Sequence, residues 1–238
     1  MKIYISPSDQ TGNLYSACNT NEAVQCRKIA DACSAALNRC GFETKTNFDD
    51  GSDAMYTRVR ESNSWGADIH LCIHTNAGGG RGCVVFVSSK DEEHLKYARP
   101  VFEELDAITL SRSVYGVREA NFYEIRRATG LCLYCECEFH DSADTALWIS
   151  EHTDDIAEAL CRGLCRASGV DYIENNNKGE DNLERWKSIG DIPAGYREMA
   201  QRYIAAGALR GKSDGDLDLT EDMLRTMEII RRYFEKEE

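Results

Sequence analysis

The sequence predicts an α/β protein, with a mostly parallel sheet covered by helices on both faces and a small helical C-terminal domain. Short apolar runs alternate with stretches of helical periodicity up to about residue 170, which is the pattern of a parallel sheet with crossover helices. NNNKGEDN (175–182) then contains no apolar residue, and two more helical patterns follow it. We therefore expect a first domain at 1–172, a linker at 173–182 and a second domain at 183–238.

Each expected element has its own local signal. Apolar residues at helical spacing run from Asn21 to Arg39, and Gly41 stands just beyond them as a helix stop. The stretch 115–130 has neither helical nor strand periodicity and is expected to be a loop. The remaining apolar runs predict strands at 2–5, 42–48, 67–74, 83–89 and 131–139, and the helical patterns predict helices at 55–66, 92–111 and 145–167.

Composition limits the classes of partner. The 238 residues are 42% apolar, enough for a substantial core, and the formal charge of −13 argues against nucleic acid as a partner. No apolar run is long enough to span a membrane, so membrane insertion is not expected. MKIYISPSDQ turns polar at Ser6, so we expect synthesis in the cytoplasm without a signal peptide.

The eleven cysteines lie mostly inside apolar, periodic segments. Cys26, Cys33 and Cys40 recur at heptad spacing on the first expected helix, as small core residues would. Cys132 and Cys135 have Cys-x-x-Cys spacing, but they lie within a strand and lack a second pair. A reduced protein with buried thiols is therefore expected rather than a disulfide framework or a structural zinc site.

Ionisable side chains stand at the ends of two apolar strands. His74 closes DIHLCIHTN, and Glu136 lies within LCLYCECEFHDS, followed four residues later by His140. Parallel strands present their carboxyl ends at one edge of the sheet, where reactive groups gather. Burying a charged Glu136 would cost several kcal/mol unless a cation, a metal or a proton compensated it. Glu22 falls in the first turn of the first helix, where the helix dipole alone could also explain it.

Four blocks carry a resemblance to a known family: the polar loop after the first strand, NEAVQCRKIA, GADIHLCIHTNAGGGRGCVVFV and YEIRRATGLCLYCECEFHDS. Their order and spacing over residues 2–170 resemble the type-3 zinc-dependent N-acetylmuramoyl-L-alanine amidases, which cut peptidoglycan. The resemblance implies that Glu22 and His74 bind zinc and that Glu136 is catalytic. It also implies metal-assisted amide hydrolysis, in which Glu136 moves a proton from water to the leaving amine.

One departure from the family concerns the first zinc ligand. The family usually supplies it as the His of Asp-Pro-Gly-His, where this chain reads Ser6-Pro7-Ser8-Asp9-Gln10. A catalytic zinc site normally keeps three protein ligands, so a substitute is expected. We expect His140 to be that metal ligand, with Asp9 or Gln10 as the alternatives.

Two more residues are candidates for substrate binding. Arg126 could contact the carboxylates of the stem peptide, although surface arginines also balance acidic neighbours. Asn76 could orient the His74 loop or the substrate, although an Asn before glycines is first of all a turn residue.

The expected function is that of an endolysin-like hydrolase from a phage or prophage, which acts on the cell wall after release. The alternative is a non-catalytic protein that binds muropeptides through a degenerate metal site, since the usual first ligand is missing. A cysteine-dependent hydrolase is disfavoured because Cys137 points away from the face of Glu136. The tail, with WKSIGDIP and GALRGKSDGDLDLT, resembles a single S-layer-homology unit. Binding to the wall and homodimerisation through this domain are both open.

Overall fold

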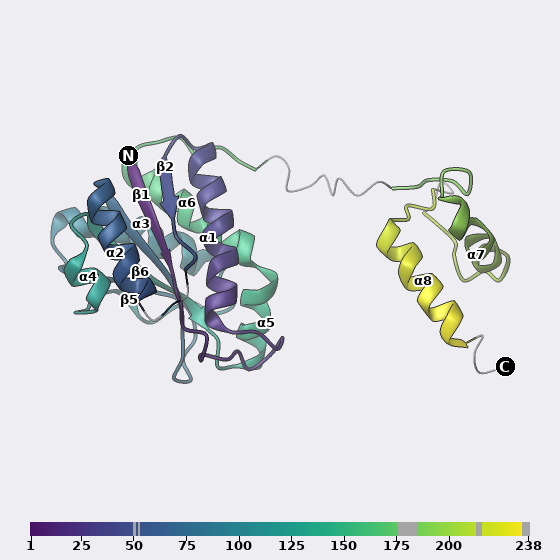
Figure 1. Ribbon diagram of the computed structural model, residues 1–238, viewed down its shortest axis with the longest axis horizontal. Coiled ribbons are helices and arrows are strands. Elements are labelled where there is room, and N and C mark those ends of the chain that lie inside the picture. Colours follow the sequence, from purple (N-terminus) through teal and green to yellow (C-terminus); the bar gives the residue numbers. More distant parts are fainter. Residues whose placement is uncertain (50, 52, 176–184, 213–215, 235–238) are drawn as a thin grey trace. The chain divides into compact units, whose positions relative to one another are not determined.

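The computed structural model in Figure 1 has two compact units, residues 1–174 and 175–238. Each unit has its own apolar core. Most of the linker expected at 173–182 lies outside the described residues. The structure describes residues 1–49, 51, 53–175, 185–212 and 216–234.

The first unit is built on a six-stranded sheet with the strand order β2-β1-β3-β6-β4-β5. β1 is parallel to β2 and β3, β3 is parallel to β6, and β4 is antiparallel to β6 but parallel to β5. The mostly parallel sheet expected from the sequence is therefore confirmed. The strands are β1 (Lys2–Pro7), β2 (Glu43–Thr46), β3 (Ile69–Asn76), β4 (Val84–Val87), β5 (Gly116–Glu119) and β6 (Leu131–Phe139).

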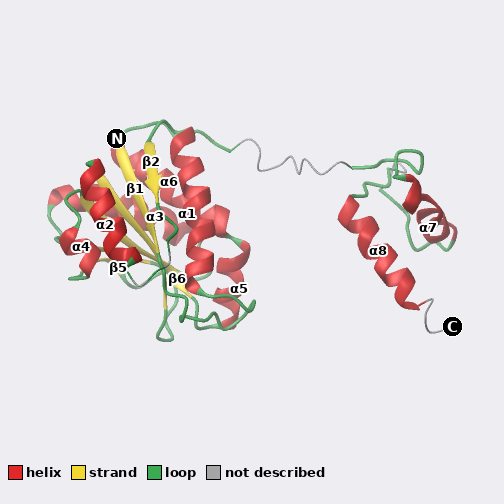
Figure 2. Cartoon of the chain, in the orientation of Figure 1, coloured by secondary structure: helices red, strands yellow, loops and turns green. Residues whose placement is uncertain are grey.

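Helices cover both faces of this sheet (Figure 2). α6 packs against both α1 and α3, and α2 packs against α4. Alternation along β3 assigns Ile69, Leu71 and Ile73 to the core under the first group. Cys72 instead packs with Ile125 of α4. The helices are α1 (Glu22–Arg39), α2 (Ala54–Trp65), α3 (Glu92–Ile108), α4 (Tyr123–Arg127), α5 (Ala143–Glu151) and α6 (Thr153–Ser168).

Two expectations about individual elements are wrong. The stretch 115–130, expected to be a loop, contains β5 and α4. Both elements are too short for periodicity to reveal, with four and five residues. The single helix expected at 145–167 is two helices that meet at His152, whose φ of −117° and ψ of 26° leave the helical region. Neither Gly nor Pro marks that junction in the sequence.

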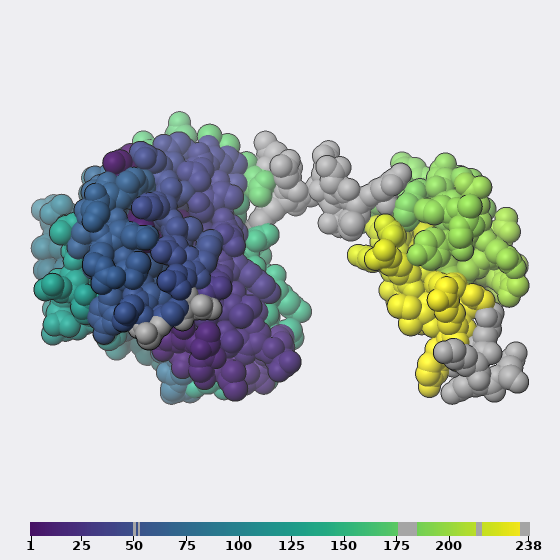
Figure 3. All heavy atoms as spheres, viewed as in Figure 1, coloured from purple at the N-terminus to yellow at the C-terminus, as the bar shows by residue number. Residues whose placement is uncertain are grey.

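The second unit contains α7 (Ala194–Ala205) and α8 (Glu221–Phe234), which pack together. In Figure 3 the yellow residues of this unit lie against its green residues. Its buried apolar residues are Trp186, Ile192, Met199, Ala200, Leu219 and Leu224. Within the described part of the whole chain, no helix has the length and apolar character needed to cross a membrane.

Candidate metal and catalytic site

Glu22 and His74 meet at the carboxyl end of β3. Glu22 is the first residue of α1, whose N-cap Asn21 accepts a hydrogen bond from the Val24 amide. The Oε1 atom of Glu22 lies 2.9 Å from Nδ1 of His74, and both residues are buried. Burial alone would raise the pKa of Glu22, but hydrogen bonds with His74 and Asn13 lower it below its ordinary value. This corner therefore favours a charged carboxylate beside an imidazole.

Strand pairing brings Glu136 to the same place. His74 of β3 stands opposite Glu136 of β6, and the register shifts by one residue directly beyond this pair. Oε2 of Glu136 is shielded from solvent and has no hydrogen-bond partner. Burial raises the pKa of Glu136, the charge of His74 lowers it and that of Glu22 raises it, to about 7. The structure thus brings Glu22, His74 and Glu136 together, with one oxygen of Glu136 that no described residue hydrogen-bonds.

The loop after β1 reaches this group through Gln10. Its Nε2 atom lies 3.4 Å from His74 Nδ1, and its Oε1 accepts a hydrogen bond from Asn13 Nδ2. Asn13 Nδ2 also donates to Oε2 of Glu22 at 2.6 Å. Asp9 lies in the same loop, but its carboxylate is paired with Arg58 at 3.1 Å. Of the two loop residues considered as ligands, Gln10 is therefore the one in contact with His74.

His140 lies on the other side of the strand end. Its Nδ1 atom is 3.0 Å from Thr75 Oγ1, and its ring stacks on Tyr15 with centroids 5.1 Å apart. Because neighbouring side chains of a strand point to opposite faces, the contact with Thr75 places the ring away from His74.

The two substrate-binding candidates occupy ordinary positions. Oδ1 of Asn76 accepts a hydrogen bond from the Ala77 amide at 2.8 Å, as a turn residue does. Arg126 is an exposed residue in the last turn of α4. Their roles in binding substrate stay predictions.

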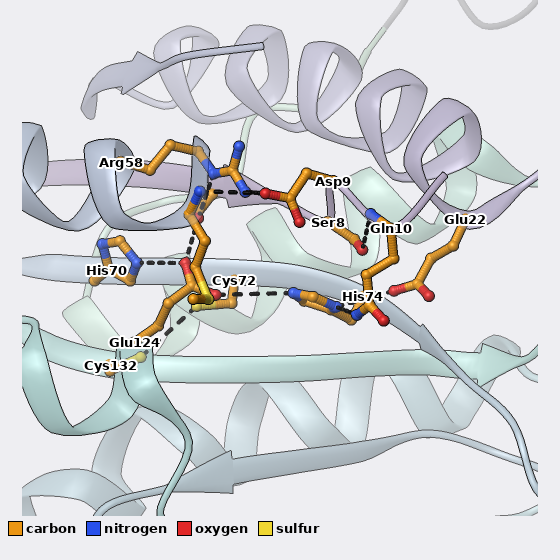
Figure 4. A network of polar contacts seen from close by, with 12 residues as sticks. Ser8, Asp9, Gln10, Glu22, Arg58, His70, Cys72, His74, Glu124 and Cys132 are labelled. Atoms are coloured by element: carbon orange, nitrogen blue, oxygen red, sulfur yellow. Dashed lines mark hydrogen bonds and ion pairs between the residues drawn. The ribbon is translucent and has the colours of Figure 1, made fainter. Parts of the chain in front are cut away.

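Glu124 is a buried carboxylate that sequence reasoning missed. It lies in α4, and its oxygens approach Ser6, His70 and His74 (Figure 4). His70, Cys72 and Glu124 offer ligand atoms that all lie within 4.8 Å of one another. Little in the sequence points to this residue, since its helix is a short turn inside a stretch expected to be a loop. The sulfur atoms of a second buried group, Cys40, Cys161 and Cys165, also lie within 4.8 Å of one another, where α1 packs on α6.

A pocket of about 240 Å³ opens beside His74. The Tyr134 ring stacks on the His74 imidazole with centroids 4.3 Å apart, and Phe122 lies against Tyr134. The polar side chains of Asp9, Gln10 and Arg58 also line the pocket. The pocket therefore offers an aromatic wall and a polar wall next to the ionisable group.

The site holds more negative than positive charge around one imidazole. Burial would lower the pKa of His74, but the nearby carboxylates of Glu124 and Glu22 and the charge of Glu136 raise it to about 10. The structure thus collects carboxylates around a single cationic position. Such an arrangement can hold a proton or a metal cation and can offer Glu136 as a base with a pKa near neutrality.

Comparison with known proteins gives a consistent family. The family described as N-acetylmuramoyl-L-alanine amidase matches residues 8–166. The amidase CwlM of Bacillus licheniformis is 31% identical over 120 residues, which are 50% of this chain and 47% of that protein. The sporulation-specific N-acetylmuramoyl-L-alanine amidase of Bacillus subtilis is 28% identical over 127 residues, 52% of this chain and 48% of that protein. The chain thus spans about half the length of these curated relatives.

Solved structures show the same fold. The N-acetylmuramoyl-L-alanine amidase from Clostridium difficile 630 has a TM-score of 0.63 at 20% identity, over 71% of this chain and 96% of that one. Since the identity is low, this likeness supports the arrangement of strands and helices and carries no further statement about chemistry.

Proposed function

Because this chain belongs to the N-acetylmuramoyl-L-alanine amidase family, we propose that it hydrolyses the amide bond between N-acetylmuramic acid and L-alanine in peptidoglycan. One observation carries the proposal most directly. Glu136 has a buried carboxylate oxygen without a partner, a pKa raised to about 7, and a position opposite His74. These are the properties of a general base that is completed by a cation and a water molecule.

We propose that the cation is zinc. Imidazole nitrogen and carboxylate oxygen are ordinary zinc ligands, and His74 Nδ1 and Glu22 Oε1 face each other. The unpartnered oxygen of Glu136 fits a site that is completed by a metal and its coordinated solvent. Zinc held here would supply Lewis acidity to polarise the substrate carbonyl and lower the pKa of water.

Gln10 is our candidate for the third ligand. The position of the Gln10 side chain beside His74 supports this choice, although the amide has to turn so that Oε1, which accepts from Asn13, faces the cation. Asp9 is paired with Arg58, and the ring of His140 contacts Thr75 on the other side of the strand end. His140, expected from the sequence to be the ligand, therefore stays a less supported prediction than Gln10.

The residues of the site then have separate roles. Glu22 and His74 hold the cation, and Glu136 takes a proton from water and returns it to the leaving amine of L-alanine. The aromatic wall formed by Phe122 and Tyr134 suits the apolar face of a sugar ring or the lactyl group. Arg126 and Asn76 remain candidates for contacting the stem peptide.

A non-catalytic muropeptide-binding protein is the alternative, and the geometry gives it less support. A site that only bound would have no need for a buried carboxylate beside His74 with an oxygen that lacks a hydrogen bond, since such a group destabilises the fold. The endolysin-like role, action on the wall after release from the cell, and wall binding or dimerisation through 183–238 stay predictions.

The test is cleavage of purified Gram-positive cell walls. The protein should release new L-alanine amino termini, and both a chelator and Glu136→Ala should abolish the release. The matched control is Glu138→Ala, which removes a neighbouring carboxylate bound to the Gly82 amide and not to His74. New reducing sugar ends would instead show that the glycan bond is cut. Folded protein that binds muropeptides without cutting them would favour the alternative.

A further inference from the structure

Glu124 is a carboxylate that is 2% exposed and has no part in the proposed chemistry. A buried charge must be compensated by hydrogen bonds or opposite charge. Oε1 of Glu124 accepts a hydrogen bond from Ser6 Oγ at 2.5 Å and lies 3.1 Å from His70 Nε2. Its other oxygen, Oε2, lies 3.9 Å from Nε2 of His74. Glu124 therefore lies between the buried His70 and the imidazole of His74.

The two nitrogens of His74 face different partners. Nδ1 faces Glu22 and Gln10 at 2.9 and 3.4 Å, and Nε2 faces Glu124. Figure 4 shows the ring lying between Glu124 on one side and Gln10 with Glu22 on the other. A histidine that binds a metal through one nitrogen usually donates its other N–H to a carboxylate, which fixes the tautomer and the ring orientation.

Glu124 is itself held in place from strand β1 and helix α2. Ser6 Oγ, which donates to Glu124, accepts a hydrogen bond from Nε of Arg58 at 3.0 Å. Arg58 is only 2% exposed, and its Nη2 pairs with Asp9. The carboxylate is thus fixed by a chain of contacts that also anchors the loop carrying Gln10.

We propose that Glu124 is a positioning residue whose negative charge, 3.9 Å from Nε2 of His74, favours the tautomer protonated at Nε2 and so leaves Nδ1 for the metal position. The proposal rests on the proposed zinc-dependent function. It assigns Glu124 no contact with substrate and no share in proton transfer to the leaving group. Loss of this carboxylate should weaken zinc binding without removing a ligand.

A second metal ion between His70, Cys72 and Glu124 would be a different explanation of the same cluster. The positive charge of Arg58, one hydroxyl away from Glu124, argues against another cation there. The Cys72 thiol also packs in an apolar cluster with Cys132 and Ile125, and burial raises its pKa well above the ordinary value. The positioning role is therefore the better account.

The experiment measures zinc affinity and stoichiometry by competition with a chromophoric chelator. Wild-type protein should bind one zinc ion, and Glu124→Gln should bind one zinc ion about 10- to 100-fold more weakly, the usual effect of removing such a carboxylate. Glu138→Gln is the matched control, since Glu138 is also buried and its Oε1 accepts hydrogen bonds from the Gly82 and Phe139 amides. Its zinc affinity should equal that of the wild type. Circular dichroism checks that each variant is folded.

Several outcomes would overturn the inference. Unchanged affinity in folded Glu124→Gln would remove the positioning role and leave the proposed function intact. Two zinc ions in the wild type and one in Glu124→Gln would make Glu124 a ligand. Equal losses in both variants would point to a general effect of buried carboxylates. A wild type that binds no zinc would instead reject the metal on which the inference rests. If Glu124→Gln does not fold, Glu124→Asp withdraws the charge by one methylene, and unchanged affinity there would be equally decisive.

Discussion

Glu136 makes the metal-free protein less stable as the pH rises. Its pKa in the folded state is about 7, against an ordinary value of 4.5. The folded state therefore holds a proton that the unfolded state has released, and stability falls as the pH rises from about 4.5 to about 7. Glu136→Gln removes this charge and should stabilise metal-free protein at pH 8 by up to about 3 kcal/mol. Urea unfolding in the presence of a chelator measures the difference.

The control for this effect is the same pair of proteins at pH 5, where most of the gain should disappear because Glu136 is then largely protonated in the folded state. A gain of equal size at both pH values would mean that the pKa of Glu136 is not raised. Amidase activity should be absent from the variant at either pH, so the same substitution exchanges function for stability.

The two candidates for the third ligand, Gln10 and His140, differ in the effect that substitution should have on zinc affinity. If Gln10 supplies the third ligand, Gln10→Ala should lower zinc affinity at least ~10-fold, comparable to or larger than the loss of a supporting group. Gln10→His should raise zinc affinity, because imidazole is a better zinc ligand than a neutral amide. His140→Ala should leave zinc affinity unchanged and destabilise the fold by about 1–3 kcal/mol through its lost contacts with Thr75 and Tyr15.

Equilibrium dialysis with metal analysis of the three variants would decide between the two ligands. Zinc retained by Gln10→Ala but lost from His140→Ala would reverse the assignment. Asp9→Asn serves as the comparison within the same loop, since it weakens the Arg58 pair and keeps Gln10.

Sequence reasoning found the residues that stand at strand and helix ends. Glu22, His74 and Glu136 each belong to a long, well-marked element, and parallel pairing brings such ends together. The direction of a side chain is harder to predict than the place of its residue in the sequence. His140 follows Glu136 closely in the chain, but its ring turns toward Thr75, because side-chain direction depends on the bulge in β6. Glu124 comes from a single helical turn that periodicity cannot detect.

At the scale of elements, the close approach of α3 and α6 depends on Gly163. A Cβ atom at this position would lie 2.5 Å from the Cα of Val101 and 2.8 Å from its nitrogen. Gly163→Ala should therefore destabilise the protein by about 1–3 kcal/mol through overpacking, despite the better helix propensity of alanine. Calorimetric unfolding of the full chain measures the change.

Gly195 in α7 provides the matched control, because a Cβ there would meet nothing within 4 Å. Gly195→Ala should raise the stability of the second unit by about 0.5–1 kcal/mol. A stabilising effect of Gly163→Ala would show that α3 and α6 have room to separate.

The order of long strands and helices was predictable because each carries a hydrophobic period and a stop signal. The break between α5 and α6 was not, since the apolar pattern continues through His152 and the amide of His152 still bonds to Trp148. The antiparallel direction of β4 was likewise hidden, because an apolar run of four residues reads the same in both directions.

At the scale of the whole molecule, the two units have separate apolar cores. The main core of the first unit is formed by β1, β3, β4, β6 and the helices α1, α3, α5 and α6, whereas the second unit buries its own tryptophan, Trp186. Ten of the eleven cysteines are buried, and all are free thiols. Several of them, such as Cys26 and Cys33, are fully buried in the main core, where they pack as small apolar side chains.

Separate cores predict that residues 1–174 fold and act without residues 175–238. The truncated protein should unfold cooperatively and cleave soluble muropeptides at the rate of the full chain, because Glu22, His74 and Glu136 all lie in the first unit. If residues 175–238 bind the wall, cleavage of intact walls should fall on the order of 10-fold or more, since a second attachment raises the local concentration of enzyme. Turbidity loss and released amino termini compare the two substrates, and sedimentation of both proteins tests dimerisation as the other role. An insoluble or inactive 1–174 fragment would show that the first unit depends on the second. If the truncated protein and the full chain are both monomeric and cleave each substrate at equal rates, residues 175–238 neither bind the wall nor form a dimer.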